Sequence, residues 1–343
     1  MITEQEVINR FFEYTVNAGY VKKARSGLVS PYFAGEFNLS AGHQYVIPVL
    51  RSAQRENVLK LCIDELCIRR IDFEKLGESP CHLLLFEMGV MGIFGYLEEI
   101  KPALNTVMRD MLNLLQLFGF ELKDLYFSVS DGATILHTTY PADSLSFSAL
   151  TSSGIPAANI FHTKGRQNFI FSKGVGRPAG NSIEVFCRRE SQYTEIASIN
   201  VYKYLFSEGK LLPTINNAIG GGFGFGRITY LLNGYNSVFE LDPFASFVSQ
   251  MRPYFRGDIE VAINQNKLFR ILELIRTLTF IENDGQKMDQ SPHGKIMKGF
   301  YDKLQSEIAF LGLEEDVVQK KAYECLSNSY SSRYKLNGYE KSC

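Results

Sequence analysis

The sequence lacks the cysteine and histidine spacing of a metal or redox site. Its six cysteines form no C-x-x-C pair, and its five histidines add no zinc-ligand spacing to them. The cysteines stand singly in apolar surroundings, which predicts reduced thiols. The spacing therefore argues against a zinc site and against a disulfide-bonded secreted domain.

The sequence also lacks a basic excess and a long apolar run. It has 36 basic and 37 acidic residues, so any contact with RNA is expected to be small or local. The longest apolar run, MGVMGIFGYL at residues 88–97, is too short to span a membrane. The first residues, MITEQEVINRFF, carry acids where a secretory signal would be basic. We expect a soluble, cytoplasmic protein with no membrane partner.

The order of the periodic segments predicts an α+β fold. A capping box at Thr3 and Glu6 opens a helix, and Pro102 opens a longer one. Strand-length runs such as KLCIDELCIRR, CHLLLFEM, LYFSVS, NFIFSK and IEVFCR surround the second helix, and the chain turns helical from about residue 244. We predict a catalytic domain over residues 1–245 and a helical C-terminal domain over residues 246–343.

The segment NNAIGGGFGFGRITYLLNG, residues 216–234, has three interpretations. A dinucleotide fingerprint fails because Phe223 takes the place of its middle glycine, and a P-loop fails because Arg227 and Ile228 replace its lysine and hydroxyl. A structural glycine turn is the second interpretation. The third is a strand of alternating glycines under a flat ligand, followed by a helix whose first turn uses Arg227 to bind a phosphate.

A second group of polar residues lies between residues 65 and 88. An antiparallel hairpin places same-face residues two apart, so it can combine cations for a phosphate, a flat face for adenine and carboxylates. Solvated arginines and a core phenylalanine are the alternative. The residues concerned are Arg69, Arg70, Asp72, Glu74, His82, Phe86 and Glu87.

Short motifs in a fixed order then point to one family. They are Cys67-Ile68-Arg69, Asp72–Gly77, Leu85–Met88, Gly154-Ile155-Pro156, PAGNSIEVF at 178–186, Tyr193 with Glu195 and Ile196, Gly222–Arg227, FELDPF at 239–244 and IRTLTFIENDG at 275–285. In this order the chain resembles the catalytic core of alanyl-tRNA synthetase, a class II aminoacyl-tRNA synthetase. The resemblance implies an antiparallel sheet flanked by helices, with a helical region after it.

The resemblance also implies a reaction, cofactors and site residues. The reaction is ATP-dependent activation of an amino acid, or a related carboxylate, as an acyl-adenylate, with ATP and Mg²⁺ as cofactors. Arg69 and Arg227 are the implied catalytic residues. ATP binding is implied for Arg69, His82, Phe86, Glu87, Gly222, Gly224 and Arg227, and a metal for Glu184 or Glu195.

Departures from the family pattern concern the substrate and the acceptor. The substrate pocket carries Ile170, Ser198 and Gly220 where the family has tryptophan, asparagine and aspartate. At residues 293–299 the family's basic helix motif has lost most of its arginines, and we expect none of the family's further domains after it. We therefore expect a truncated relative, with a homodimer as one option for its assembly, that transfers its acyl group to a carrier protein, a small molecule or a tRNA acceptor stem. The alternatives are a minimal tRNA ligase and an inactive regulatory protein that binds a nucleotide or an amino acid.

Overall fold

The computed structural model describes residues 1–256, 258–259 and 261–336. It forms two compact units, and neither is continuous in sequence. The first comprises Met1–Ser26, Ser40–Glu65 and Glu87–Leu232, and the second comprises Gly27–Leu39, Leu66–Phe86 and the described part of Asn233–Cys343. The domain boundary that we predict at residue 245 stays a prediction.

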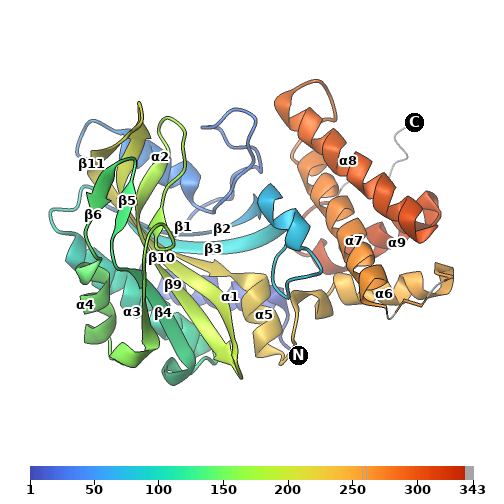
Figure 1. Ribbon diagram of the computed structural model, residues 1–343, viewed down its shortest axis with the longest axis horizontal. Coiled ribbons are helices and arrows are strands. Elements are labelled where there is room, and N and C mark those ends of the chain that lie inside the picture. Colours follow the sequence, from blue (N-terminus) through green and yellow to red (C-terminus); the bar gives the residue numbers. More distant parts are fainter. Residues whose placement is uncertain (257, 260, 337–343) are drawn as a thin grey trace. The chain divides into compact units, whose positions relative to one another are not determined.

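A sheet of nine strands organises the chain (Figure 1). Its order is β1-β2-β3-β11-β10-β9-β4-β7, and β8 pairs with β9 outside this path. β11 is antiparallel to both β3 and β10, and β9 is antiparallel to β10 and β4, while β1–β2 and β4–β7 are parallel. The strands are β1 (Val21–Lys22), β2 (Leu59–Ile68), β3 (Leu85–Gly95), β4 (Leu125–Ser130), β7 (Ile160–Thr163), β8 (Phe169–Ile170), β9 (Pro178–Arg189), β10 (Gln192–Ser207) and β11 (Lys210–Gly224). A separate hairpin joins β5 (Ala133–Ile135) and β6 (Thr138–Tyr140).

The helices of the first unit begin and end where the sequence provides signals. The Thr3 hydroxyl accepts a hydrogen bond from the Glu6 N–H at 3.2 Å, and the Glu6 carboxylate accepts one from the Thr3 N–H at 2.7 Å. Gly119 closes the second predicted helix in the left-handed region, at φ 111°. These helices are α1 (Glu4–Asn17), α2 (His43–Arg51), α3 (Ile100–Phe118), α4 (Ser144–Ser152) and α5 (Phe225–Leu232).

The two faces of the central strands differ in their covering. Phe11 of α1 packs its ring against Phe223 and Phe225, at centroid distances of 5.6 and 5.4 Å. A Cβ on Gly221 would lie 2.8 Å from Met111 Cε of α3, so α3 packs directly on this backbone. We call the opposite face of β9, β10 and β11 the polar face, because Ser182, Glu184, Ser198 and Asn200 share it in register.

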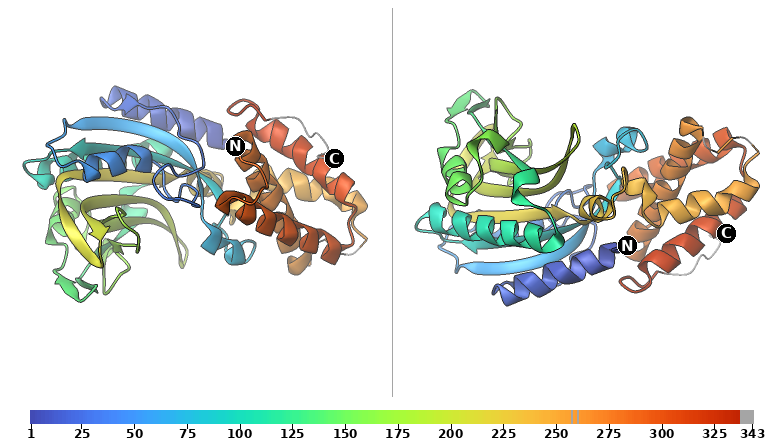
Figure 2. Two further views of the ribbon diagram at one scale, coloured as in Figure 1. Left: turned by 90° about the horizontal axis from the view of Figure 1, so that it is seen from above. Right: turned by 90° about the horizontal axis from the view of Figure 1, so that it is seen from below.

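The second unit is mainly helical (Figure 2). Buried Glu273 of α7 accepts a hydrogen bond from the Leu85 N–H at 2.7 Å and pairs with Arg276, whose Nη1 donates to the Tyr330 hydroxyl of α9 at 2.7 Å. The pair thus connects three segments of the unit. Its helices are α6 (Phe244–Met251), α7 (Ala262–Asn283), α8 (Pro292–Leu311) and α9 (Glu315–Tyr330).

The predicted α+β class, with a sheet flanked by helices and helices after it, is confirmed. Two predicted strands are shorter than expected. Only Phe169 and Ile170 of NFIFSK form a strand of the sheet. CHLLLFEM enters the sheet only at Leu85. Within the described residues, no helix is both long and apolar enough to cross a membrane.

Candidate active site

The glycine-rich segment is a strand and not a turn. β11 runs through Gly224, α5 starts at Phe225, and Arg227 therefore lies in the first turn of α5. The backbone is that of the third interpretation, and the glycine turn is wrong. The flat ligand and the phosphate of that interpretation stay predictions. Gly220 and Gly222 face the polar side, where a Cβ on Gly220 would meet only side chains, the nearest 3.6 Å away.

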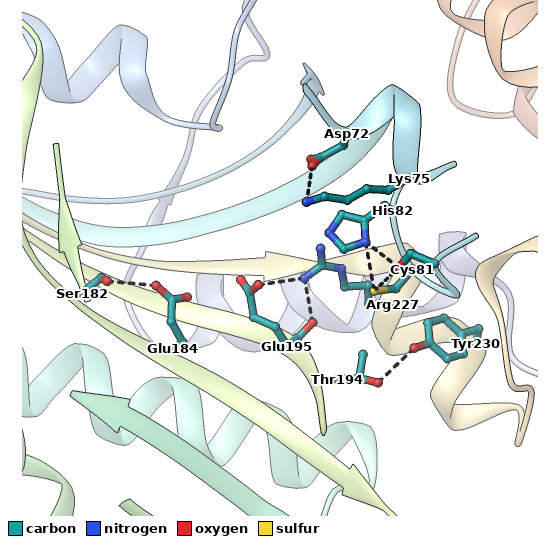
Figure 3. Close-up of polar contacts among 11 residues, drawn as sticks. Asp72, Lys75, Cys81, His82, Ser182, Glu184, Thr194, Glu195, Arg227 and Tyr230 are labelled. Carbon is teal, nitrogen blue, oxygen red and sulfur yellow. Dashed lines mark hydrogen bonds and ion pairs between the residues drawn. The ribbon is translucent and has the colours of Figure 1, made fainter. Parts of the chain in front are cut away.

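Arg227 is held by Glu195 of β10 (Figure 3). Its Nη1 donates to the Glu195 backbone carbonyl at 2.9 Å and lies 3.1 Å from the Glu195 carboxylate. The Arg227 side chain is 21% exposed and that of Glu195 is 43% exposed. The arginine is therefore fixed by one residue at two points while part of its surface stays accessible.

A β-bulge places Glu195 on the polar face. Glu195 pairs with Phe186, but Ala197 pairs with Val185, so Ile196 is an extra residue on β10. Without it, Glu195 and Ser198 would point to opposite faces, because successive strand residues alternate. Sequence reasoning gave no sign of the bulge.

Glu184 lies on the neighbouring strand of the same face, opposite Ser198. The Ser182 hydroxyl donates to its carboxylate at 2.9 Å (Figure 3). In the part of the chain that the structure describes, no three His, Cys, Asp or Glu side chains gather as a metal site. Two carboxylates on adjacent strands nevertheless fit Mg²⁺, which takes one or two carboxylates and completes its shell with water and phosphate oxygens. The metal role of Glu184 and Glu195 stays a prediction.

The three predicted pocket residues lie on the strands around this group. Ser198, which is buried, pairs with Glu184 on one side and with Gly222 on the other. Gly220 pairs with Asn200, and Ile170 of β8 pairs with Gly180 of β9. Sequence reasoning missed Asn200, because only the strand register reveals that it lies opposite Gly220.

Three further predicted residues belong to the second unit. The Arg69 Nε donates to the Leu39 carbonyl at 3.0 Å, and its guanidinium lies 4.9 Å from the centre of the Phe86 ring. Within the described chain, the Arg69 Nη groups donate no hydrogen bond, so the four Nη N–H donors of an oriented guanidinium stay available for a ligand. The Nδ1 of His82 lies 2.6 Å from the Ser79 hydroxyl.

With this geometry in place, comparison with known proteins gives a consistent result. No protein-family model matches the chain. An alanine–tRNA ligase of Lacticaseibacillus paracasei is 24% identical over 273 residues, covering 73% of this chain and 29% of that protein. One of Bifidobacterium longum is 22% identical over 340 residues, covering 91% and 36%. The chain is similar to alanine–tRNA ligases. It spans only about a third of the length of these two relatives.

Solved structures of class II synthetases overlap the chain in part. The apo histidyl-tRNA synthetase of S. aureus has a TM-score of 0.44 at 13% identity, covering 67% of this chain and 66% of that chain. The RNA-binding domain of a threonyl-tRNA synthetase from Cryptosporidium parvum has a TM-score of 0.47 at 9% identity, covering 77% and 79%. Independently of these structures, the curated relatives confirm the resemblance to alanyl-tRNA synthetases that the motifs predict.

Glu87 lies on the opposite face of the sheet from Gly222 and Gly224. The resemblance to alanine–tRNA ligases implies a role for it in ATP binding. Glu87 precedes Met88 on β3, and Met88 pairs with Gly224, so Glu87 points to the side of the sheet away from the polar face. Its buried carboxylate binds Arg25 at 2.7 Å, and Arg25 also binds Asp64. Direct contact of Glu87 with ATP stays a prediction, and its placement favours a structural role.

Proposed function

We propose that the protein activates an amino acid, or a related carboxylate, with ATP, and passes the acyl group to a carrier protein, a small molecule or a tRNA acceptor. In the activation step, a substrate carboxylate oxygen attacks the α-phosphorus. The bond from that phosphorus to the bridging oxygen breaks, so an acyl-adenylate forms and pyrophosphate leaves. The chain's task is to position the reactants and to balance the charge on the phosphate oxygens.

The observation that carries this proposal is Arg227 at the start of α5, directly after the glycines of β11. A planar guanidinium can bind phosphate oxygens through two parallel N–H groups. Gly222 and Gly224 leave the strand backbone without long side chains, as the approach of a flat nucleotide requires. Similarity to alanine–tRNA ligases supports the same reaction.

The other residues take roles that follow from their chemistry. In the second unit, Arg69 has two unused Nη groups among the described residues and would bind the α-phosphate, and Phe86 and His82 of the same unit would contribute to nucleotide binding. Glu184 or Glu195 would hold Mg²⁺, which offsets phosphate charge when bound. Because Arg227 and Glu195 are paired, a nucleotide would bind between a cation and a carboxylate that already orient each other.

Amino-acid-dependent ATP–pyrophosphate exchange, measured over a panel of amino acids, tests the proposal. We expect exchange with at least one amino acid, and a loss of about 100-fold or more in Arg69→Ala and in Arg227→Ala. Arg55→Ala is the matched control, because Arg55 also stacks on an aromatic ring, 4.1 Å from the centre of Tyr96. No exchange with any amino acid, or unchanged exchange in both arginine variants, would refute the proposal and favour a regulatory binding protein.

A further inference from the structure

On the polar face, the side-chain amide of Asn200 makes no hydrogen bond within the described residues. Asn200 of β10 pairs with Ser182 of β9 on one side and with Gly220 of β11 on the other. Its Oδ1 is buried without a hydrogen-bond partner, and among the described residues its amide makes no hydrogen bond at all. Because Gly220 has no side chain, β11 places nothing over the Asn200 amide.

Two buried asparagine amides of the first unit are fully hydrogen-bonded, as is expected of an amide with a structural role. The Oδ1 of Asn168 accepts from the Thr163 hydroxyl at 2.6 Å, and its Nδ2 donates to two carbonyls. The Nδ2 of Asn216 donates to the Gln54 carbonyl at 2.8 Å, and its Oδ1 accepts from the Glu56 N–H at 2.9 Å. A buried amide oxygen without such a bond weakens the fold, and groups of this kind call for a functional explanation.

The surroundings indicate which ligand group the amide would bind. The charged side chain diagonal to Asn200 is the carboxylate of Glu184, which follows Ser182 by two residues on the same face. A negative neighbour favours a cation over an anion. A half-turn of the amide exchanges its oxygen and nitrogen and breaks no hydrogen bond, because neither atom has one among the described residues.

We propose that Asn200 determines the substrate class by accepting a hydrogen bond from the α-ammonium of an amino acid. This inference rests on the proposed activation function, and it narrows the substrate to a carboxylate with a neighbouring amino group. The amide oxygen supplies the acceptor, and the Glu184 carboxylate supplies favourable charge at a distance when Glu195 is the residue that holds the metal. A carboxylic acid without the amino group gains nothing from Asn200.

The test combines two variants with two ligands. The stabilisation of the protein by each amino acid of the panel, in the presence of ATP and Mg²⁺, is measured as a shift in Tm. The amino acid that stabilises most is then compared with its analogue lacking the amino group, in wild type, Asn200→Ala and Asn200→Asp. We expect Asn200→Ala to weaken binding of the amino acid about tenfold or more and to leave binding of the analogue unchanged. Asn200→Asp keeps the shape, adds a charge, and should bind the amino acid at least as tightly as wild type.

A matched control is Asn181 of β9, whose neighbour Ser182 lies on the polar face, so that Asn181 points to the other side of the strand. Asn181→Ala should leave binding of both ligands unchanged. Asn200→Ala should also keep the Tm of the ligand-free protein, since the amide makes no bond that the fold would lose.

Two results would overturn the inference. Either no amino acid raises the Tm of the wild type, or Asn200→Ala weakens the binding of the amino acid and of its analogue equally. If amino acids bind through Asn200 but pyrophosphate exchange is absent, the activation function fails and the assignment of Asn200 stands.

Discussion

Neighbouring glycines of β11 have different tasks, because alternate strand residues face opposite sides. A Cβ on Gly221 would lie 2.8 Å from Met111 Cε, whereas a Cβ on Gly220 would make only ordinary contacts, at 3.6 Å or more. We expect Gly221→Ala to lower the free energy of unfolding by about 1–3 kcal/mol through overpacking. Gly220→Ala should change it by less than about 0.5 kcal/mol. Urea denaturation of both variants checks this, and equal losses would contradict the assignment of the two faces.

The two carboxylates of the polar face have different partners, so their roles can be tested separately. Glu184 is bonded by the Ser182 hydroxyl, whereas Glu195 pairs with Arg227. If Glu184 holds Mg²⁺, Glu184→Gln should weaken ATP binding about tenfold with Mg²⁺ and leave it unchanged in EDTA. Glu195→Gln should weaken binding in EDTA as well, because it also loosens Arg227. Calorimetric titration with ATP measures both. Exposed Glu190 provides the control variant Glu190→Gln, and equal loss in EDTA for Glu184→Gln would indicate a structural role.

At the residue scale, the sequence predicts side chains that belong to a local motif. Arg227 follows the glycines directly, so its position at the start of a helix can be predicted from residues 220–227 alone. Asn200 and Arg25 belong to no motif. Their roles depend on the pairing of β10 with β11, and on contacts with Asp64 and Glu87, which lie far along the chain.

At the scale of helices and strands, the strand registers determine which side chains share a face, and local sequence patterns do not predict these registers. Strands β2 and β3 and the strand before α5 exist, because their apolar patterns are local. The prediction that Arg70, Asp72 and Glu74 lie on the strands of a hairpin is wrong, because residues 70–75 form a 3-10 helix between β2 and β3. The bulge at Ile196 depends on how β10 fits two partner strands at once. A single inserted residue therefore decides whether Glu195 joins Glu184 on the polar face or points away from it.

Two aspartates, one after α7 and one before α8, lead to predictions on how the stability of the protein depends on pH. Asp284 follows α7, and its carboxylate accepts a hydrogen bond from the Leu28 N–H. Burial raises the pKa of Asp284 above its ordinary value, despite that bond. As the pH rises from the ordinary value to the raised one, the folded state holds more protons than the unfolded state, so stability falls. We expect Asp284→Asn to stabilise the protein more at pH 7 than at pH 4, as measured by denaturant unfolding.

Asp289, shortly before α8, is the control with the opposite sign. Hydrogen bonds from the Ser291 side chain and its N–H, the latter at 2.9 Å, lower the pKa of Asp289. Its contribution to stability is therefore present at pH 7 and is lost as the pH falls through the lowered pKa. Asp289→Asn should lower stability at pH 7 and have a smaller effect below pH 4. The same pH trend in both variants would contradict the burial of Asp284.

At the scale of the whole molecule, net charge bears on which acceptor the proposed reaction would use. The sequence carries 36 basic and 37 acidic residues, so its overall field does not attract a polyanion. The exposed residues Lys295 and Lys298 lie in α8. Their segment resembles the basic helix motif that alanyl-tRNA synthetases use beside the acceptor stem of the tRNA. An RNA contact that rests on two such lysines releases few counterions and stays weak.

We therefore expect whole tRNA to bind with a Kd weaker than about 10⁻⁶ M at physiological salt, as in non-specific binding. Filter binding between 50 and 200 mM salt measures both the affinity and its salt slope. If α8 makes the contact, Lys298→Glu should weaken binding at low salt, while Lys320→Glu on α9 should have no effect. A tight Kd at physiological salt would contradict this expectation and make tRNA the favoured acceptor. Weak binding that depends on Lys298 would instead favour a small molecule or a carrier protein, because neither requires a long basic surface.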